Sequence, residues 1–344
     1  MKKLLVRGNS GRSTILVGES LDHADTYIDG RRLVIITDSK VKEIYGDRFP
    51  DCPVITIALG EKNKTVDTVT SIFEKLVDLE ADRSTFILGI GGGIVCDITG
   101  FVASTYMRGT RFGFVASTLL AQVDASVGGK NGVNFGGYKN MVGVFNQPEF
   151  VICDTTMLKT LPMREVLCGF AEIIKHGAIA DGHMLDFIET HRDAALDLDP
   201  GIINHLVYRS VEIKAGVVAR DEWEKGERRK LNFGHTFGHA LEKITGIPHG
   251  EAVAIGMVMA ANLSVQKGFL DRHDAVRMEQ VVNSYGLPWQ FPVNVADTLV
   301  AMRKDKKRDG DGIHFVFLDS LGNALVEEIT FKKLRQLTSA VRIG

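Results

Sequence analysis

A short apolar run that ends in three successive glycines limits the fold of this chain more than any other feature of its sequence. Residues 86–90 have the composition of a buried strand and continue directly into Gly91, Gly92 and Gly93. Residues 33–38 form an earlier β-rich run, and a helical apolar pattern follows Thr65, which is suited to capping a helix. Strand, helix, strand and glycine turn is the order of an open α/β sheet that binds a nucleotide at its carboxyl edge.

The glycine turn by itself has two interpretations. Backbone N–H groups in such a turn can approach a pyrophosphate closely, because no Cβ atom intervenes and a helix N-terminus adds positive charge. A tight turn packed beneath a helix has the same composition. The segment does not match the GxGxxG spacing, so its sequence alone leaves both interpretations open.

The second half of the chain changes to helical spacing. After residue 156 only residues 314–318 have the pattern of a strand or hairpin. We therefore predict an α/β fold, with a Rossmann-like N-terminal domain over residues 1–156 and a mainly α-helical domain over residues 157–344. The helical patterns cover residues 163–180, 201–221, 234–245, 251–267 and 272–285.

The composition excludes several classes of protein. With 44% hydrophobic and 24% charged residues, the chain is globular rather than disordered. A formal net charge of -2 at pH 7 provides no overall field toward nucleic acid or an anionic membrane. No apolar stretch qualifies as a membrane span, and the N-terminal apolar run is too short for a signal peptide. The four cysteines are widely spaced, which is typical of a reducing compartment, so we expect a cytoplasmic protein.

Three histidines within fifteen residues suggest a metal site. His235 and His239 are four residues apart in a helical pattern and would share one face, and His249 follows after a turn. Imidazole and carboxylate ligands suit zinc or cobalt, and a catalytic site needs three protein ligands and an open position. Spacing alone favours His235 and His239 as a pair of ligands. Buried histidines bonded to backbone, or a general-base cluster without metal, are the alternatives.

Several polar side chains stand in sequence that is otherwise apolar or glycine-rich. Glu172 and Lys175 lie in a helical pattern whose neighbours leave little surface for water, which argues against a plain surface ion pair. Glu61 follows a strand and offers an acid for ribose hydroxyls, with Lys64 nearby, although a solvated turn has the same composition. In a chain of nearly zero net charge, the cationic set suits a small substrate with more than one negative group. This set is Arg108, Lys130, Lys139, Lys175, Lys214, Arg228, Lys306 and Lys307.

Taken in order, these motifs resemble one family across nearly the whole chain. They are Gly60-Glu61-x-x-Lys64, Gly91-Gly92-Gly93-x-x-x-Asp97, Tyr106-Met107-Arg108-Gly109, Asp124-Ala125-Ser126-Val127-Gly128-Gly129-Lys130, Lys139-Asn140, Thr160-Leu161-Pro162, Ala171-Glu172-x-Ile174-Lys175, Arg228-x-x-x-Asn232-x-Gly234-His235-Thr236-x-Gly238-His239, His249-Gly250-Glu251 and Asp305-Lys306-Lys307. One such motif would be weak evidence, but the ordered set is specific. The chain resembles the 3-dehydroquinate synthases, which are sugar-phosphate cyclases.

The resemblance implies a homodimer with an N-terminal NAD-binding domain and a helical domain that binds Zn²⁺ or Co²⁺. It implies Glu172, His235 and His249 as the metal ligands, which moves His239 from the metal to substrate binding and proton transfer. The implied cofactor residues are Asp38, Glu61, Lys64, Gly92, Gly93, Asp97, Ser117, Thr118, Lys130, Lys139 and Thr160. The implied substrate and catalytic residues are Arg108, Asp124, Lys130, Asn140, Lys175, Lys214, Arg228, Asn232, His239 and Lys306.

The activity implied by this resemblance belongs to the shikimate pathway of aromatic amino acid biosynthesis. Such enzymes convert 3-deoxy-D-arabino-heptulosonate 7-phosphate to 3-dehydroquinate and phosphate. The steps are transient oxidation by NAD, loss of phosphate, re-reduction and an intramolecular aldol closure. The partner would therefore be a small phosphorylated sugar acid, and neither nucleic acid nor a membrane. Another sugar-phosphate cyclase, or a metal-dependent polyol dehydrogenase of the glycerol type, is the alternative.

Overall fold

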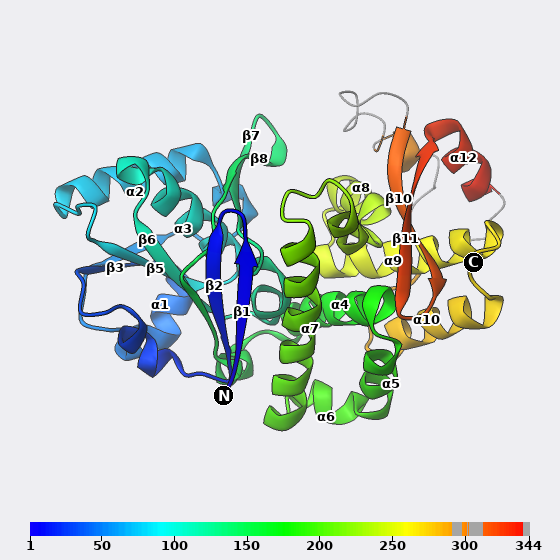
Figure 1. Cartoon of the computed structure of the whole chain (residues 1–344), viewed down its shortest axis with the longest axis horizontal. Helices are drawn as coiled ribbons and strands as arrows, with labels where there is room; N and C mark the ends of the chain where they lie inside the picture. Colours follow the sequence, from blue (N-terminus) through cyan, green and yellow to red (C-terminus); the bar gives the residue numbers. More distant parts are fainter. Residues whose placement is uncertain (291–297, 301, 303–311, 340–344) are drawn as a thin grey trace. The chain divides into compact units, whose positions relative to one another are not determined.

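The computed structural model describes residues 1–290, 298–300, 302 and 312–339 (Figure 1). The chain divides into two compact units. The first contains Met1–Pro162 and Ile203–Glu222, and the second contains Met163–Ile202 and Trp223–Gly344. The first unit therefore extends to residue 162 and also includes the later segment Ile203–Glu222. The predicted boundary was a single division of the chain after residue 156.

A seven-stranded sheet forms the centre of the first unit. Its strand order is β1-β2-β9-β6-β5-β3-β4, and every neighbouring pair is parallel except β1 and β2. The strands are β1 (Lys2–Gly8), β2 (Gly11–Val17), β3 (Leu33–Asp38), β4 (Val54–Ile57), β5 (Phe86–Gly91), β6 (Arg111–Ala116) and β9 (Phe150–Cys153).

The interior strands have apolar side chains on both faces, as buried parallel strands require. Every residue of β5 is buried, and Phe86, Leu88 and Ile90 pack with Ile35 and Ile152 in one core cluster. The helices of this unit are α1 (Ser39–Tyr45), α2 (Val66–Asp78), α3 (Gly93–Thr105) and α7 (Pro200–Arg220). The predicted strands at residues 33–38 and 86–90 and the predicted helix after Thr65 are confirmed, and Thr65 caps α2.

The strand order creates a switch point between β3 and β5. From β3 the chain crosses outward to β4, and it then returns to the other side of β3 to form β5, β6 and β9. Ligands of open α/β sheets bind outside the carboxyl ends of the strands at such a point. A separate hairpin of β7 (Lys130–Phe135) and β8 (Tyr138–Phe145) projects beyond the sheet (Figure 1).

The second unit is mainly helical, as predicted. Its helices are α4 (Met163–Ala180), α5 (Gly182–Thr190), α6 (Arg192–Leu196), α8 (His235–Thr245), α9 (His249–Gln266), α10 (Arg272–Ser284) and α12 (Phe331–Ser339). The strands β10 (Gly312–Ser320) and β11 (Asn323–Thr330) form an antiparallel hairpin, which confirms the late strand. Helix α9 is buried over most of its length, and α4, α8, α10 and β10 pack against it.

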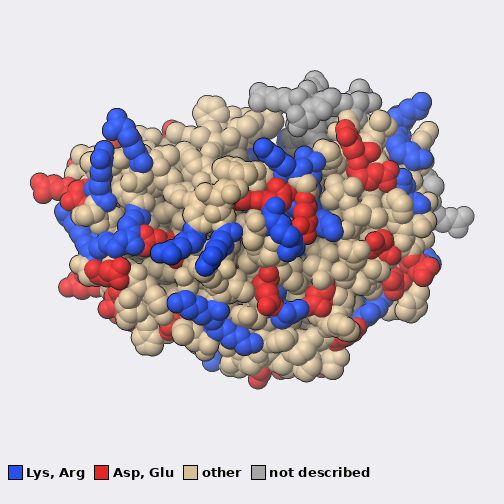
Figure 2. Space-filling view, viewed as in Figure 1, with Lys and Arg blue, Asp and Glu red and all other residues tan. Residues whose placement is uncertain are grey.

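Within the part of the chain that the structure describes, no helix has the length and apolar character needed to cross a bilayer. Lysine and arginine side chains are interspersed with aspartate and glutamate on the face drawn in Figure 2. This mixed surface agrees with the formal net charge of -2, which provides no overall field toward an anionic partner.

Candidate active site

Glu172, His235 and His249 form a cluster in the second unit. Glu172 lies on α4, whereas the two histidines are the first residues of α8 and α9. The Oε1 atom of Glu172 is 3.6 Å from Nε2 of His235 and 3.5 Å from Nε2 of His249. The three candidate ligand atoms all lie within 4.8 Å of one another, so one cation can be shared by them.

Hydrogen bonds to the remaining ring nitrogens orient both histidines. The Nδ1 atom of His235 lies 3.1 Å from the carbonyl oxygen of Phe233, and Nδ1 of His249 lies 3.4 Å from Oε2 of Glu242. A carbonyl or carboxylate oxygen can only accept, so each Nδ1 donates and each Nε2 is the atom left to bind a cation. This arrangement is typical of metal-binding histidines, whose second nitrogen is commonly held in this way. The donor set therefore fits Zn²⁺ or Co²⁺.

Burial affects the protonation of the two histidines differently. Desolvation, with a further contribution from Lys175, lowers the pKa of His235 well below its usual value and keeps the ring neutral. Burial also opposes the charged form of His249, but hydrogen bonds to Glu172 and Glu242 outweigh it and raise the pKa to about 9. A cation at this cluster would therefore displace a proton from His249 when it binds.

Close packing between helices holds the cluster together. A Cβ atom at Gly250 would lie 2.3 Å from the Cα atom of Cys168, so only glycine allows α9 to approach α4 at this point. Next to it, the guanidinium of Arg164 donates to both carboxylate oxygens of Glu251, at 2.6 and 3.1 Å. Gly234, with φ of 79°, begins α8 in the left-handed region. These contacts place residues from three helices within reach of one ion.

Three other predicted residues of the second unit are buried or hydrogen-bonded, and Lys175 contacts the cluster directly. Lys175 is only 1% exposed and forms an ion pair with Glu172. Arg228 is 2% exposed in the turn before Asn232, and Asn232 donates a hydrogen bond to Glu224. The predicted burial around Glu172 and Lys175 is confirmed.

His239 differs from the two histidines of the cluster. It is exposed, and its ring centroid lies 5.2 Å from that of His235. Glu224 and Glu242 contact site residues but were not singled out in the sequence, because neither lies in a motif that carries chemistry. Lys306 lies outside the described residues.

The predicted nucleotide residues of the first unit follow the ends of neighbouring strands. Asp38 ends β3, Gly92 and Gly93 follow β5, and Ser117 and Thr118 follow β6. The pairing of Gly91 with Ala116 and of Asp38 with Ile57 puts these ends at one edge of the sheet. These five predicted residues therefore lie at the edge of the sheet where the glycine turn was expected to act.

The glycine turn forms the N-terminus of α3. Within the described residues, Gly92 caps the helix without a side-chain hydrogen bond. A Cβ atom at Gly92 would lie 3.0 Å from Thr118 Cγ2, and one at Gly93 would lie 3.0 Å from Ala125 Cβ. The turn is thus both packed tightly against its neighbours and placed at a helix N-terminus, which combines the two interpretations left open by the sequence.

Two predicted cofactor residues also have structural contacts. Asp38 caps α1, because its Oδ1 atom accepts from the backbone N–H groups of Lys40 and Val41 at 2.9 and 2.8 Å. The Thr160 hydroxyl lies 2.6 Å from the Tyr45 hydroxyl and donates to the carbonyl of Met157. Their positions are therefore fixed by the fold before any ligand binds.

A buried lysine joins further predicted residues of the first unit. Lys64 is 5% exposed, and its Nζ atom contacts a carboxylate oxygen of Asp97 and lies 2.5 Å from Oδ1 of Asn140. Burial raises the pKa of Asp97, and the charge of Lys64 opposes this increase. On α7, Lys214 donates to the carbonyl and carboxylate oxygens of Asp124 at 2.6 and 2.7 Å.

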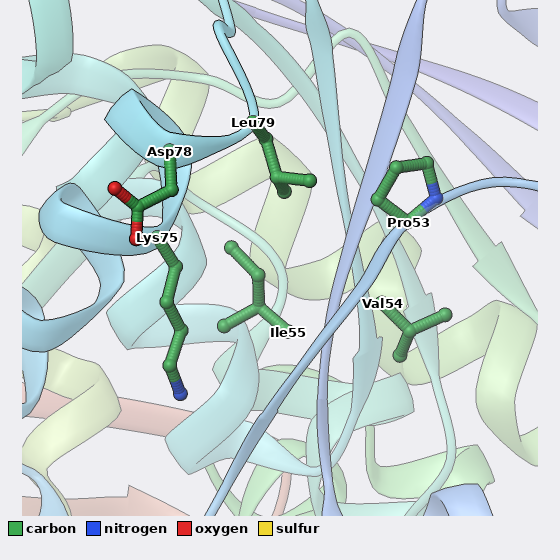
Figure 3. Close-up of a pocket in the computed structure, with 6 residues that line it drawn as sticks. All are labelled: Pro53, Val54, Ile55, Lys75, Asp78 and Leu79. Atoms are coloured by element: carbon green, nitrogen blue, oxygen red, sulfur yellow. The ribbon is translucent and has the colours of Figure 1, made fainter.

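Three other predicted cationic side chains of this unit, Arg108, Lys130 and Lys139, are exposed. A shallow pocket also lies at the outer edge of the sheet beside β4 and the end of α2, and none of the predicted site residues lines it (Figure 3). Its lining residues are Pro53, Val54, Ile55, Lys75, Asp78 and Leu79.

Comparison with known families gives two adjacent matches. The family model described as 3-dehydroquinate synthase N-terminal matches residues 54–168, and that described as 3-dehydroquinate synthase C-terminal matches residues 169–308. Together these matches extend over more than half of the chain.

Solved structures with similar folds include two sugar-phosphate cyclases. A 2-deoxy-scyllo-inosose synthase in complex with carbaglucose-6-phosphate, NAD⁺ and Co²⁺ is 26% identical, with a TM-score of 0.86 over 98% of this chain and 99% of that one. A 2-epi-5-epi-valiolone synthase from Streptomyces hygroscopicus subsp. jinggangensis 5008, with NAD⁺ and Zn²⁺ bound, is 26% identical, with a TM-score of 0.85 over 94% and 95%. A probable glycerol dehydrogenase from Sinorhizobium meliloti 1021 is 17% identical with a TM-score of 0.66 over 95% of each chain, which indicates a shared fold alone.

Proposed function

The chain belongs to the 3-dehydroquinate synthase family of sugar-phosphate cyclases, and from this premise we propose that it is itself a 3-dehydroquinate synthase. The substrate would be 3-deoxy-D-arabino-heptulosonate 7-phosphate, and the products 3-dehydroquinate and phosphate. The observation that carries the proposal is the cluster of Glu172, His235 and His249, with both Nε2 atoms turned toward one carboxylate oxygen. The cyclases with bound NAD⁺ and Co²⁺ or Zn²⁺ support the same cofactors here.

Glu172, His235 and His249 would hold the divalent cation, and the edge of the sheet around Gly92 and Gly93 would hold NAD. When bound, NAD would supply a reversible hydride acceptor, and the cation a charge that lowers the pKa of substrate hydroxyls. Because the reaction takes up and returns the same hydride, it needs only a catalytic amount of NAD.

Other predicted side chains would bind the anionic groups and hydroxyls of the substrate and transfer a proton. Arg228 and Lys175 are buried cations, which suits the binding of phosphate or carboxylate away from water. His239 is exposed beside His235, so its imidazole can reach a bound substrate and exchange a proton with it near neutral pH. In the first unit, Lys214 and Asp124 form a preset polar pair for substrate hydroxyls. The homodimer implied by the resemblance belongs to the same proposal.

A sugar-phosphate cyclase of another kind is the second candidate, because the two similar cyclases are an inosose synthase and a valiolone synthase. A polyol dehydrogenase has weaker support, since the similarity to the probable glycerol dehydrogenase extends to the fold alone. The deciding experiment measures phosphate release from the heptulosonate phosphate with catalytic NAD and Zn²⁺ or Co²⁺, with glucose 6-phosphate and glycerol in parallel. Phosphate from the sugar acid alone supports the proposal, whereas phosphate from glucose 6-phosphate alone supports the second candidate.

A further inference from the structure

Asn134 contacts two predicted site residues in the first unit. Its Nδ2 atom donates to Oε1 of Glu61 at 2.8 Å, and its Oδ1 atom accepts from the backbone N–H of Asn140 at 2.9 Å. Glu61 belongs to the predicted cofactor side and Asn140 to the predicted substrate side. One amide therefore links the two sides within the first unit.

The backbone at Asn134 is shaped for this link. The pairing of β7 with β8 shifts register between Val133 and Phe135, so Asn134 leaves the regular ladder. Its own N–H donates instead to the carbonyl of Lys64 at 2.8 Å, and a short parallel bridge joins it to Thr65. Irregularities of this kind re-aim a side chain, and they are common near active sites. The bend directs the amide of Asn134 toward the loop that carries Glu61.

The other end of the link is also fixed. Asn140 has φ of 52°, in the left-handed region that favours glycine, and its Oδ1 accepts from Lys64, which contacts Asp97. The Asn134 bond to the N–H of Asn140 helps to hold this conformation. The contacts therefore close a ring from Glu61 through Asn134 and Asn140 to Lys64.

We propose that Asn134 is a positioning residue that couples the NAD side of the site to the sugar-phosphate side by orienting Glu61 and Asn140 together. This inference rests on the proposed function for the identity of the two ligands. The two ends of an amide differ chemically, since only the NH2 group can donate to Glu61 and only the carbonyl can accept from Asn140. A substitution can therefore disturb one end and spare the other.

Asn134→Asp is the selective variant, because aspartate can still accept from Asn140 but sets a negative charge against Glu61. Loss of a charged hydrogen bond is worth about 1.5–3 kcal/mol, so we expect the Kd for NAD to rise about tenfold or more. The KM for the sugar phosphate at saturating NAD should change much less than the Kd for NAD, and the chain should stay fully folded at the assay temperature. Asn134→Ala, which removes both ends, should raise both constants.

Two further variants separate positioning from a general effect of charge. Asn63→Asp makes the same chemical change in the Glu61 loop, where the amide donates to the carbonyl of Leu59, and it should leave the NAD Kd within a few-fold. In a Glu61→Gln background, Asn134→Asp should cost little, because the new amide can donate to the new carboxylate. Equal losses in both backgrounds, or a wild-type Kd for NAD in Asn134→Asp alone, would overturn the coupling.

Calorimetric titration with NAD supplies the Kd values of this cycle without turnover. A wild-type chain that binds NAD but releases no phosphate from the heptulosonate phosphate would therefore refute the proposed function without altering the result of the cycle. Failure of the proposed function and failure of the coupling through Asn134 therefore give different results.

Discussion

His249 is held from both sides by carboxylates, because its Nδ1 atom lies 3.4 Å from Glu242 while its Nε2 atom faces Glu172 at 3.5 Å. The contact with Glu242 lies behind the ring, on the side away from the candidate cation. It fixes the tautomer and increases the basicity of Nε2, which is the usual effect of a carboxylate in this position. The cluster therefore depends on a residue outside the ligand set.

Replacing that carboxylate should weaken metal binding without removing a ligand. We expect Glu242→Gln to lower the affinity for Zn²⁺ about 10- to 100-fold, as loss of such outer contacts typically does. Glu251→Gln is the matched control, since Glu251 lies beside His249 but binds Arg164. Competition titration with a chromogenic chelator measures both variants, and equal affinities would contradict the role given to Glu242.

Metal content should distinguish His249 from His239. His249→Ala loses one of three ligands, so we expect the purified chain to contain little metal. His239→Ala should keep nearly one metal per chain but turn over about 10²–10⁴-fold more slowly, because proton transfer is lost. Elemental mass spectrometry measures the metal. Metal loss in His239→Ala with retention in His249→Ala would support the His235 and His239 pair instead.

Buried Arg228 should matter more than a surface arginine would. If Arg228 contacts phosphate or carboxylate, Arg228→Ala should lower kcat/KM roughly 30- to 1000-fold. This corresponds to a loss of about 2–4 kcal/mol of transition-state stabilisation. Arg228→Lys keeps the charge but loses the planar fork, so we expect only partial recovery. Exposed Lys130 allows the same test in the first unit with less risk to folding. Steady-state kinetics that match the wild type would place either residue outside the site.

The approach of α9 to α4 should depend on Gly250. A methyl group there meets backbone at 2.3 Å, so Gly250→Ala should destabilise the chain by about 1–3 kcal/mol or more. Gly216→Ala on α7 is a control, because its nearest neighbour is the flexible end of Arg220 at 3.4 Å. That change should be neutral or stabilising by up to about 1 kcal/mol. Urea unfolding measures both, and equal stabilities would refute the tight contact.

Patterns of local spacing predicted much of this fold. The helices α4, α7, α8, α9 and α10 begin and end within about two residues of the apolar patterns, because each packs an apolar stretch of helical length into the core. The β7–β8 hairpin was missed, since asparagine and glycine interrupt both strands and the second strand is mostly exposed. Helices α5 and α6 were missed because they are short, and short helices depend on packing rather than on their own sequence.

The site shows where reasoning from spacing ends. His239 is four positions after His235, and this spacing favoured them as a pair. The second ring that faces Glu172, however, is His249, at the start of another helix. Only the close packing of α8 and α9 brings His249 there, and the resemblance, not the spacing, indicated it. Glu242 and Asn134 act through contacts with other side chains, so nothing in their own sequence identified them.

The proposed redox-neutral cyclisation predicts a specific ratio of phosphate to NADH in a single assay. The purified chain is incubated with 3-deoxy-D-arabino-heptulosonate 7-phosphate, Zn²⁺ or Co²⁺ and a small amount of NAD, while phosphate and the absorbance of NADH are followed together. We predict many equivalents of phosphate per NAD and no net NADH, because the hydride leaves and returns within one site. Stoichiometric NADH from a simple polyol, without phosphate release from the sugar acid, would contradict the account.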